Sequence, residues 1–268
     1  MREMTPLPSL LSRWSALLLS LLLPASSALG EAVFCAPAMK AVIPEISVIL
    51  DARASGGGMK GAFTADDPPS ALAMEGFFAA AFHSEFGDTA RDALIRWEVP
   101  LRIFVRGEFT GEDMQTLEAL LQGLQARVPG LPNMDFSTSE KEANVVISFA
   151  PYMRMAEYLV TYEDGNWGFM NCFSDDKAIR YGMIAIAADV TNQEDRNHLI
   201  QEEFVNMLGL TADLDFAPES IIYQPYTRTQ ALAEVDYEML NLLYAPFLDA
   251  GMSLAQAKAA LYEIFERP

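Results

Sequence analysis

The stretch QEEFVNMLGL, residues 201–210, lies in a segment whose apolar residues recur with a helical period. We expect a helix over about 194–208 that ends at Gly209, its C-terminal glycine. Projection at about 100° per residue places Glu203 next to the apolar sector rather than opposite it. The members of that sector are Ile200, Phe204, Met207 and Leu208. Glu203 is therefore predicted to point inward, which is costly for a charged carboxylate without a partner.

Two interpretations of an inward Glu203 remain open. It is a structural carboxylate that accepts bonds from backbone amides, a tyrosine or an arginine, or it is a general base or acid with a raised pKa. His198 and Glu202, four residues apart on one helical face, are predicted to share a metal or to form a surface ion pair. A nucleophile pair of Cys172 and His198 is a further alternative, whereas His83 is predicted to be a partly buried structural histidine.

The remaining sequence alternates strands and helices and then becomes mostly helical, which predicts an α+β fold. Thr110 with Asp113, and Ser253 with Gln256, have the spacing of helix N-terminal capping boxes. Strands are expected at 100–105, 144–149 and 182–188, with further candidates at 45–53 and 158–162; helices are expected at 70–86, after Thr110, at 194–208, 234–244 and 254–266.

The N-terminus has the layout of a secretory signal. Arg2 and Arg13 precede the apolar block 14–23, and small residues follow at Ser26 and Ala28. That block is shorter than the roughly 20 residues of a spanning helix. We therefore expect a signal peptide over residues 1–28, a leader or linker over 29–65 and one domain over 66–268, in an exported protein that is periplasmic or secreted.

Charge and cysteine content restrict the partners and the redox chemistry. The chain carries 37 acidic and 18 basic side chains, a net charge of −19, which argues against nucleic-acid binding. No segment after residue 30 is long and apolar enough to cross a bilayer, so no integral membrane segment is expected after cleavage. In an oxidising compartment, Cys35 and Cys172 either form one disulfide or stay as thiols, and the sequence leaves both open.

The spacing of residues 202–210 resembles the zinc-binding helix of the zincin metallopeptidases, whose pattern is HExxHxxGL. In that frame Glu203 takes the general-base position and Gly209 the glycine position, while Glu202 and Asn206 stand where two zinc-binding histidines belong. Ala212 occupies the third ligand position of the metzincin pattern, and Asp213 follows it. No histidine stands at any of the three positions, so peptidase activity does not follow from the frame.

Neighbouring segments extend this resemblance. Residues 143–149 are similar to the central strand of matrixin-type peptidases, 182–190 to their substrate-edge strand, and 236–244 to their last helix. Residues 220–223 stand where the Met-turn belongs, with Ile222 in place of methionine.

Residues 66 to 262 together resemble the bacterial family called domain of unknown function 2927. The marks of this family are Arg96-Trp97 before Pro100, the EExxNxLGL helix, Ser220-Ile221, Asp236 and the segment 243–253. The resemblance implies a zincin-like fold. We therefore expect a mixed, mostly parallel sheet of four to five strands, an active-site-type helix and a helical C-terminal part.

Metal chemistry is limited by the donor atoms. Zinc sites use mainly nitrogen and sulfur ligands, whereas Glu202, Asn206 and Asp213 offer only oxygen, which suits calcium, magnesium or manganese better. The main prediction is therefore that no cofactor is bound, and the alternative is a divalent cation.

Three functional hypotheses follow. The first is a non-catalytic binding or scaffold module of the cell envelope, whose partner is an extended peptide or an envelope protein taken up by strand addition beside residues 182–188. The second is a metal-dependent peptidase or other hydrolase with non-histidine ligands and Glu203 as general base. The third is an envelope structural protein whose acidic surface keeps it soluble. Non-catalytic roles are favoured, because a fold alone does not confer activity.

Overall fold

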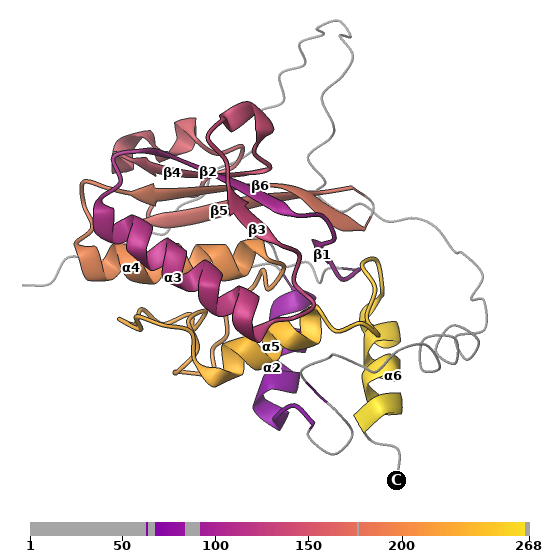
Figure 1. The fold of residues 1–268 in the computed structure, drawn as a ribbon. Coiled ribbons are helices and arrows are strands. Elements are labelled where there is room, and N and C mark those ends of the chain that lie inside the picture. Colours follow the sequence, from indigo (N-terminus) through magenta and orange to yellow (C-terminus); the bar gives the residue numbers. More distant parts are fainter. Residues whose placement is uncertain (1–62, 64–67, 84–91, 176, 266–268) are drawn as a thin grey trace, which may run out of the picture. The chain divides into compact units, whose positions relative to one another are not determined.

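The computed structural model of the protein describes residues 63, 68–83, 92–175 and 177–265, which form an α+β fold (Figure 1). The strands are β1 (Arg96–Trp97), β2 (Leu101–Gly107), β3 (Met134–Phe136), β4 (Val145–Ala150), β5 (Gly168–Ser174) and β6 (Ala178–Ala187). The α-helices are α2 (Ala71–Ala81), α3 (Gly111–Arg127), α4 (Gln193–Met207), α5 (Glu234–Leu243) and α6 (Leu254–Phe265). Two short 3-10 helices, η1 (Glu140–Glu142) and η2 (Tyr152–Glu157), flank β4.

The six strands form one mostly parallel sheet. Its strand order is β1-β6-β4-β2-β3, and β5 joins antiparallel to β6. Figure 1 shows α3 and α4 against one face of this sheet, and α4 contacts β5 and β6 directly. All six residues of β4 are buried, which is typical of an interior parallel strand covered on both faces.

The helix predictions agree closely with the structure, and two of the helices begin at the capping boxes expected from the sequence. The Thr110 hydroxyl accepts from the backbone of Asp113 at 3.1 Å, and the Asp113 carboxylate accepts from Thr110 N–H at 2.7 Å. Ser253 and Gln256 make the corresponding bonds at the start of α6. The helix expected from residue 70 ends at Ala81, earlier than predicted.

The strand predictions need correction. The expected number of four to five strands is too low among the described residues, because the patterns of β1, β3 and β5 were not recognised. The strand proposed at 158–162 is wrong: this segment is irregular, and Leu159 packs instead against Phe169 and Met155 on the outer face of the sheet. Val160 and Thr161 donate their backbone N–H groups to the Asn171 side chain rather than to a neighbouring strand.

The segment expected at the substrate edge is an interior strand. β6 is bordered by β4 on one side and by β5 on the other, so β5 stands at the edge. The physical reason is that β6 carries a continuous run of buried small and apolar residues, which suits a strand covered on both faces. Strand addition directly beside residues 182–188 is therefore excluded, since β5 already occupies that position.

The main core lies between the sheet and the helices, and Trp97 is at its centre with 1% of its surface exposed. The Trp97 indole N–H donates to the Met207 carbonyl at 3.0 Å. The Tyr244 hydroxyl accepts from Trp97 N–H at 3.3 Å and donates to the Leu208 carbonyl at 2.8 Å. Arg96 donates to the carbonyl of Leu243 at 3.1 Å. These bonds join β1 to the ends of α4 and α5. They give the Arg96-Trp97 pair, singled out in the sequence as a mark of the family, a structural role.

Several predictions fall on residues outside the described ranges: the signal peptide 1–28, almost all of the leader 29–65, the strand at 45–53, and Cys35 with its disulfide. They remain predictions. Among the described residues, no helix is long and apolar enough to cross a membrane.

Candidate functional site

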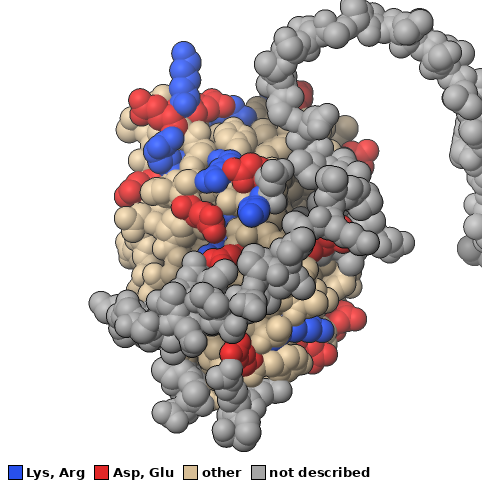
Figure 2. Space-filling view, turned by 90° about the vertical axis from the view of Figure 1, so that its right-hand side faces the viewer, with Lys and Arg blue, Asp and Glu red and all other residues tan. Residues whose placement is uncertain are grey.

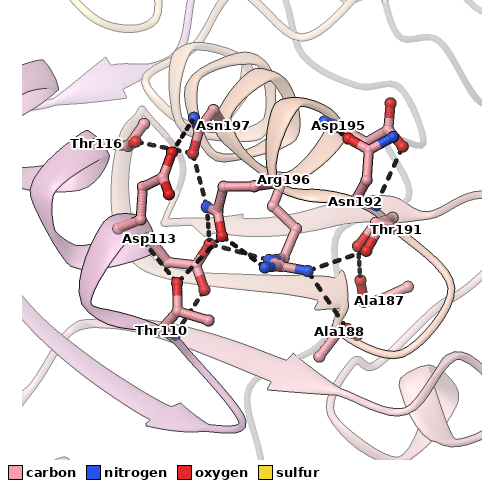
Figure 3. Close-up of polar contacts among 12 residues, drawn as sticks. Thr110, Asp113, Thr116, Ala187, Ala188, Thr191, Asn192, Asp195, Arg196 and Asn197 are labelled. Carbon is pink, nitrogen blue, oxygen red and sulfur yellow. Dashed lines mark hydrogen bonds and ion pairs between the residues drawn. The ribbon is translucent and has the colours of Figure 1, made fainter.

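A buried polar network fixes the start of α4 (Figure 3). Arg196 forms an ion pair with Asp113 of α3 at 3.0 Å, with side chains 12% and 0% exposed. The same guanidinium donates to the carbonyl of Thr191 at 3.0 Å and to the side chain of Gln193 at 2.6 Å. Thr191 follows β6, so a single arginine joins the end of a strand and the beginnings of two helices. This network therefore links the start of α4 to α3 and to the end of β6.

Small residues allow the other end of α4 to lie close to the sheet. A β-carbon at Gly182 of β6 would lie 2.5 Å from Met207 Sδ. Gly209 follows the helix with a φ of +124°, a conformation that side-chain-bearing residues rarely adopt. A β-carbon there would also lie 2.5 Å from the Ile95 carbonyl oxygen. Gly209 is therefore required by backbone conformation and by space, as its predicted role as C-terminal glycine implies.

Glu203 lies beneath the edge strand. The residue is 9% exposed, so its predicted inward orientation is confirmed. A β-carbon at Gly168, the first residue of β5, would lie 2.7 Å from Glu203 Oε1 and 2.9 Å from Leu199 Cδ2. The absence of a side chain at Gly168 provides the space that the Glu203 carboxyl group occupies. Gly168 was not recognised from the sequence, because nothing in the local pattern marks it as a neighbour of α4.

Asn206 and Asp213 are brought together, as their places in the sequence frame suggested. The Asn206 amide donates to Asp213 Oδ1 at 3.4 Å, and Asn206 is 4% exposed. Burial raises the pKa of the Asp213 carboxyl group to about 6, and the bond from Asn206 partly opposes this rise. The Asn206 Oδ1 atom is buried and has no hydrogen-bond partner in the described part of the chain. An unpaired buried acceptor of this kind is costly and is a position where an added donor or cation would bind.

His198 and Glu202 form a separate pair. His198 Nε2 lies 3.5 Å from Glu202 Oε2, and the two side chains are 4% and 16% exposed. The ring is buried rather than part of a surface pair, and burial lowers the pKa of His198. Its Nδ1 donates to the Thr229 carbonyl at 2.9 Å. Both ring nitrogens are thus directed at groups other than Cys172, so the structure does not support the Cys172–His198 nucleophile pair.

A segment comprising residues 223–233 crosses the face of α4 that carries His198. The Tyr226 hydroxyl bonds to Asp195. Gln201 donates to the Gln230 carbonyl at 2.9 Å, and Gln230 in turn donates to the carbonyl of Glu194 at 3.1 Å. This 223–233 segment is therefore held to α4 mainly through side chains. None of these contacts was predicted, because they join residues far apart in the sequence.

Two further residues singled out from the sequence have structural roles. Asp236 is fully buried and accepts from the Ser220 hydroxyl at 2.5 Å, from Ile221 N–H at 3.1 Å and from Ala233 N–H at 2.7 Å. It thereby joins the turn at 220–221 to the start of α5. His83 is exposed, which corrects the expectation of partial burial, and its ring bonds to the Ala79 carbonyl one turn earlier.

The residues at the zinc-ligand positions of the frame do not fit zinc. Glu202 and Asn206 offer oxygen, and Ala212 offers no donor. Within the described ranges, no group of three or more His, Cys, Asp and Glu side chains could hold a metal ion. An oxygen-only set of Glu202, Asn206 and Asp213 has the chemistry of a hard-cation site instead.

The outer edge of β5 offers backbone hydrogen-bonding groups. Ala187 N–H donates to the Trp167 carbonyl, and hydrogen-bonded pairs alternate along an antiparallel ladder. Gly168 and Met170 consequently direct their N–H and C=O groups away from β6. The Met170 carbonyl accepts from the Asn171 side chain at 3.0 Å. The remaining groups of Gly168 and Met170 have no backbone partner among the described residues. Gly168 is buried and Met170 is half-buried, so Met170 is the part of this edge that is open to another strand.

The charged surface does not resemble a nucleic-acid site on the face shown in Figure 2. Acidic and basic side chains are interspersed there rather than gathered into one basic patch. This agrees with the net charge of −19.

Comparisons with known proteins place the chain in a family without assigning a function. Two solved structures of myroilysin are weakly similar, each at 10% identity. One has a TM-score of 0.36 and covers 56% of this chain and 82% of that chain; the other has 0.35 and covers 66% and 98%. No curated protein matches the sequence. The family described as "Protein of unknown function (DUF2927)" matches residues 70–263, so the chain belongs to DUF2927.

Proposed function

We propose that the protein is an exported, zincin-like but non-catalytic module that binds an extended peptide along the outer edge of β5. The observation that carries this proposal is the half-buried Met170, whose backbone N–H is directed away from β6 and has no backbone partner among the described residues. Main-chain bonds give affinity in strand addition, and pockets for alternate side chains give specificity. This mode needs no metal.

The side chains of α4 support a non-catalytic role. The zincin frame requires nitrogen ligands, and this chain has Glu202, Asn206 and Ala212 at those positions. Glu203, the residue at the general-base position, is enclosed beneath Gly168. A buried carboxylate packed against a glycine has a structural role that needs no reacting water. The zincin-like relation rests on the sequence frame and on the place of α4 beneath an antiparallel edge strand.

Peptide selection tests the proposal directly. A library of linear peptides is displayed against the protein, and the selected peptides are measured by the fluorescence of Trp167, which is 41% exposed just before β5. Met170→Pro removes one outward N–H and should abolish binding, because proline cannot donate to a ladder. Met170→Ala loses the same side chain but keeps the N–H, so it should retain binding. Equal binding by the two variants would rule out strand addition at this edge.

Glu203→Gln separates binding from catalysis. A module that only binds should keep its affinity for the selected peptides in this variant, and those peptides should stay intact after prolonged incubation. Cleavage by the native protein that disappears in Glu203→Gln would instead establish a hydrolase.

A hydrolase is the second candidate, and one observation favours it: Asn206 Oδ1 is buried without a partner next to the Asp213 carboxyl group. In such an enzyme Glu202, Asn206 and Asp213 would hold a divalent cation through oxygen, and Glu203 would take the proton from a water molecule. Elemental analysis of protein purified without chelators tests this candidate. A stoichiometric metal that is lost in Asp213→Asn, together with chelator-sensitive peptide cleavage, is the result that it requires.

Export is tested separately by cell fractionation. The first 28 residues should direct a fused reporter out of the cytoplasm, and the mature protein should begin at Leu29. A reporter that stays in the cytoplasm would refute the export part of the proposal and leave peptide binding unaffected.

A further inference from the structure

The protonation of His198 follows from its hydrogen bond. A backbone carbonyl can only accept, so the 2.9 Å contact between His198 Nδ1 and the Thr229 oxygen requires a proton on Nδ1. The ring is 3% exposed, and burial disfavours the doubly protonated, charged form. The neutral ring therefore has its lone pair on Nε2.

The Nε2 lone pair faces a carboxylate oxygen of Glu202, so two hydrogen-bond acceptors lie opposite each other. Glu202 Oε2 lies 3.5 Å from His198 Nε2, which is longer than the 2.7–2.9 Å or so of a charge-assisted hydrogen bond. Metal–nitrogen bonds of about 2.05 Å and metal–oxygen bonds of about 2.1 Å at a tetrahedral angle place the two ligand atoms about 3.4 Å apart. The observed separation therefore matches two ligands of one metal ion better than it matches a hydrogen bond.

The surroundings of the ring have the form of a metal site. A histidine that binds a metal commonly donates its other N–H to a backbone carbonyl, which fixes the tautomer and the ring orientation. Thr229 provides this carbonyl. His198 and Glu202 are also separated by four residues, a spacing that places two ligands on one helical face.

We propose that His198 Nε2 and Glu202 bind a first-row divalent transition metal ion such as Zn²⁺, with water completing its coordination. The ion would stabilise the 223–233 segment on α4, because metal binding fixes the imidazole whose Nδ1 donates to Thr229. His198 lies outside the HExxH positions of the sequence frame, whereas Glu202 stands at the first of them. The proposed site therefore shares Glu202 with the zincin ligand set and differs from it by using His198. It is also independent of peptide binding at β5.

Equilibrium dialysis with Zn²⁺ and the visible spectrum of added Co²⁺ test the site in the purified protein. The native protein should bind one equivalent, and His198→Gln or Glu202→Gln should weaken binding at least tenfold. Glu202→Gln keeps the bond from His198 to Thr229, so its effect does not depend on loss of the 223–233 segment. His83→Gln, which changes the exposed second histidine, is the matched control and should bind as the native protein does.

Two results would overturn the proposal. One is the absence of binding at millimolar Zn²⁺ in the native protein. The other is binding that persists in His198→Gln but is lost in Asp213→Asn; this would move the ion to the oxygen donors of the hydrolase candidate.

Discussion

Gly168 and Glu203 are packed so closely that a β-carbon on the glycine would lie 2.7 Å from the carboxylate oxygen Oε1. Gly168→Ala should therefore destabilise the protein by about 1–3 kcal/mol, the usual cost of overpacking. In Gly168→Ala/Glu203→Ala the added methyl group no longer meets the carboxyl group and contacts only the flexible end of Leu199, so part of the overpacking is relieved and the two effects should not add. Urea unfolding of the double-mutant cycle measures this coupling. Strict additivity would show that the two residues are not in contact.

Gly209→Ala should be among the most destabilising single substitutions, at about 2 kcal/mol or more. The φ of +124° is unfavourable for alanine, and the new β-carbon would meet the Ile95 carbonyl at 2.5 Å. Gly111→Ala is the control: Gly111 begins α3, and a β-carbon there has no neighbour within 4 Å. That change should be neutral or slightly stabilising. Similar midpoints of thermal unfolding for the two variants would contradict the role assigned to Gly209.

Arg196→Met should cost about 3–5 kcal/mol, because it leaves the fully buried Asp113 carboxylate without its cation. Arg154→Met is the control, since Arg154 pairs with Glu157 at the surface, where both side chains are more than half exposed. Its loss should cost less than about 1 kcal/mol. Chemical denaturation of both variants tests the difference; equal losses would show that the network in Figure 3 does not anchor α4.

Asp213 should make stability depend on pH between about 4 and 6. Its pKa is raised to about 6 in the folded protein from an ordinary value of 3.8, so folding favours the protonated form. The resulting stabilisation is fully present below pH 3.8 and is lost as the pH rises through 6. This pKa difference corresponds to about 3 kcal/mol. Asp213→Asn should remove the part of this dependence that Asp213 contributes to unfolding free energies measured across the range. The part from Asp236, whose pKa burial also raises to about 6, should remain. An unchanged profile would show that Asp213 titrates normally.

The helices of the fold were predictable because their signals are local. Thr110 with Asp113 predicts the start of α3, and Gly209 predicts the end of α4, without knowledge of any distant residue. β5 was missed because Gly168 and Asn171 are weak strand formers, and its conformation depends on pairing with β6. The strand expected at 158–162 failed for the opposite reason. Its strand-forming residues lie in an irregular segment, where Leu159 covers one face of the sheet.

The candidate site was predictable to the extent that it depends on one helix. The projection of α4 gave the inward position of Glu203 and the common face of His198 and Glu202. It could not give Gly168 above Glu203 or the Thr229 carbonyl beside His198, because the tertiary fold brings these groups together. No local pattern encodes such contacts.

The bonds of Trp97 restrict when this domain can fold. Its indole N–H reaches the Met207 carbonyl and its backbone N–H reaches the Tyr244 hydroxyl, contacts that span 110 and 147 residues. During synthesis the first half of the domain therefore lacks its core partners until Tyr244 has left the ribosome. Contacts of such sequence separation carry a large loop-closure entropy and slow folding. We expect folding to follow synthesis, and chains truncated before Tyr244 to remain sensitive to proteases.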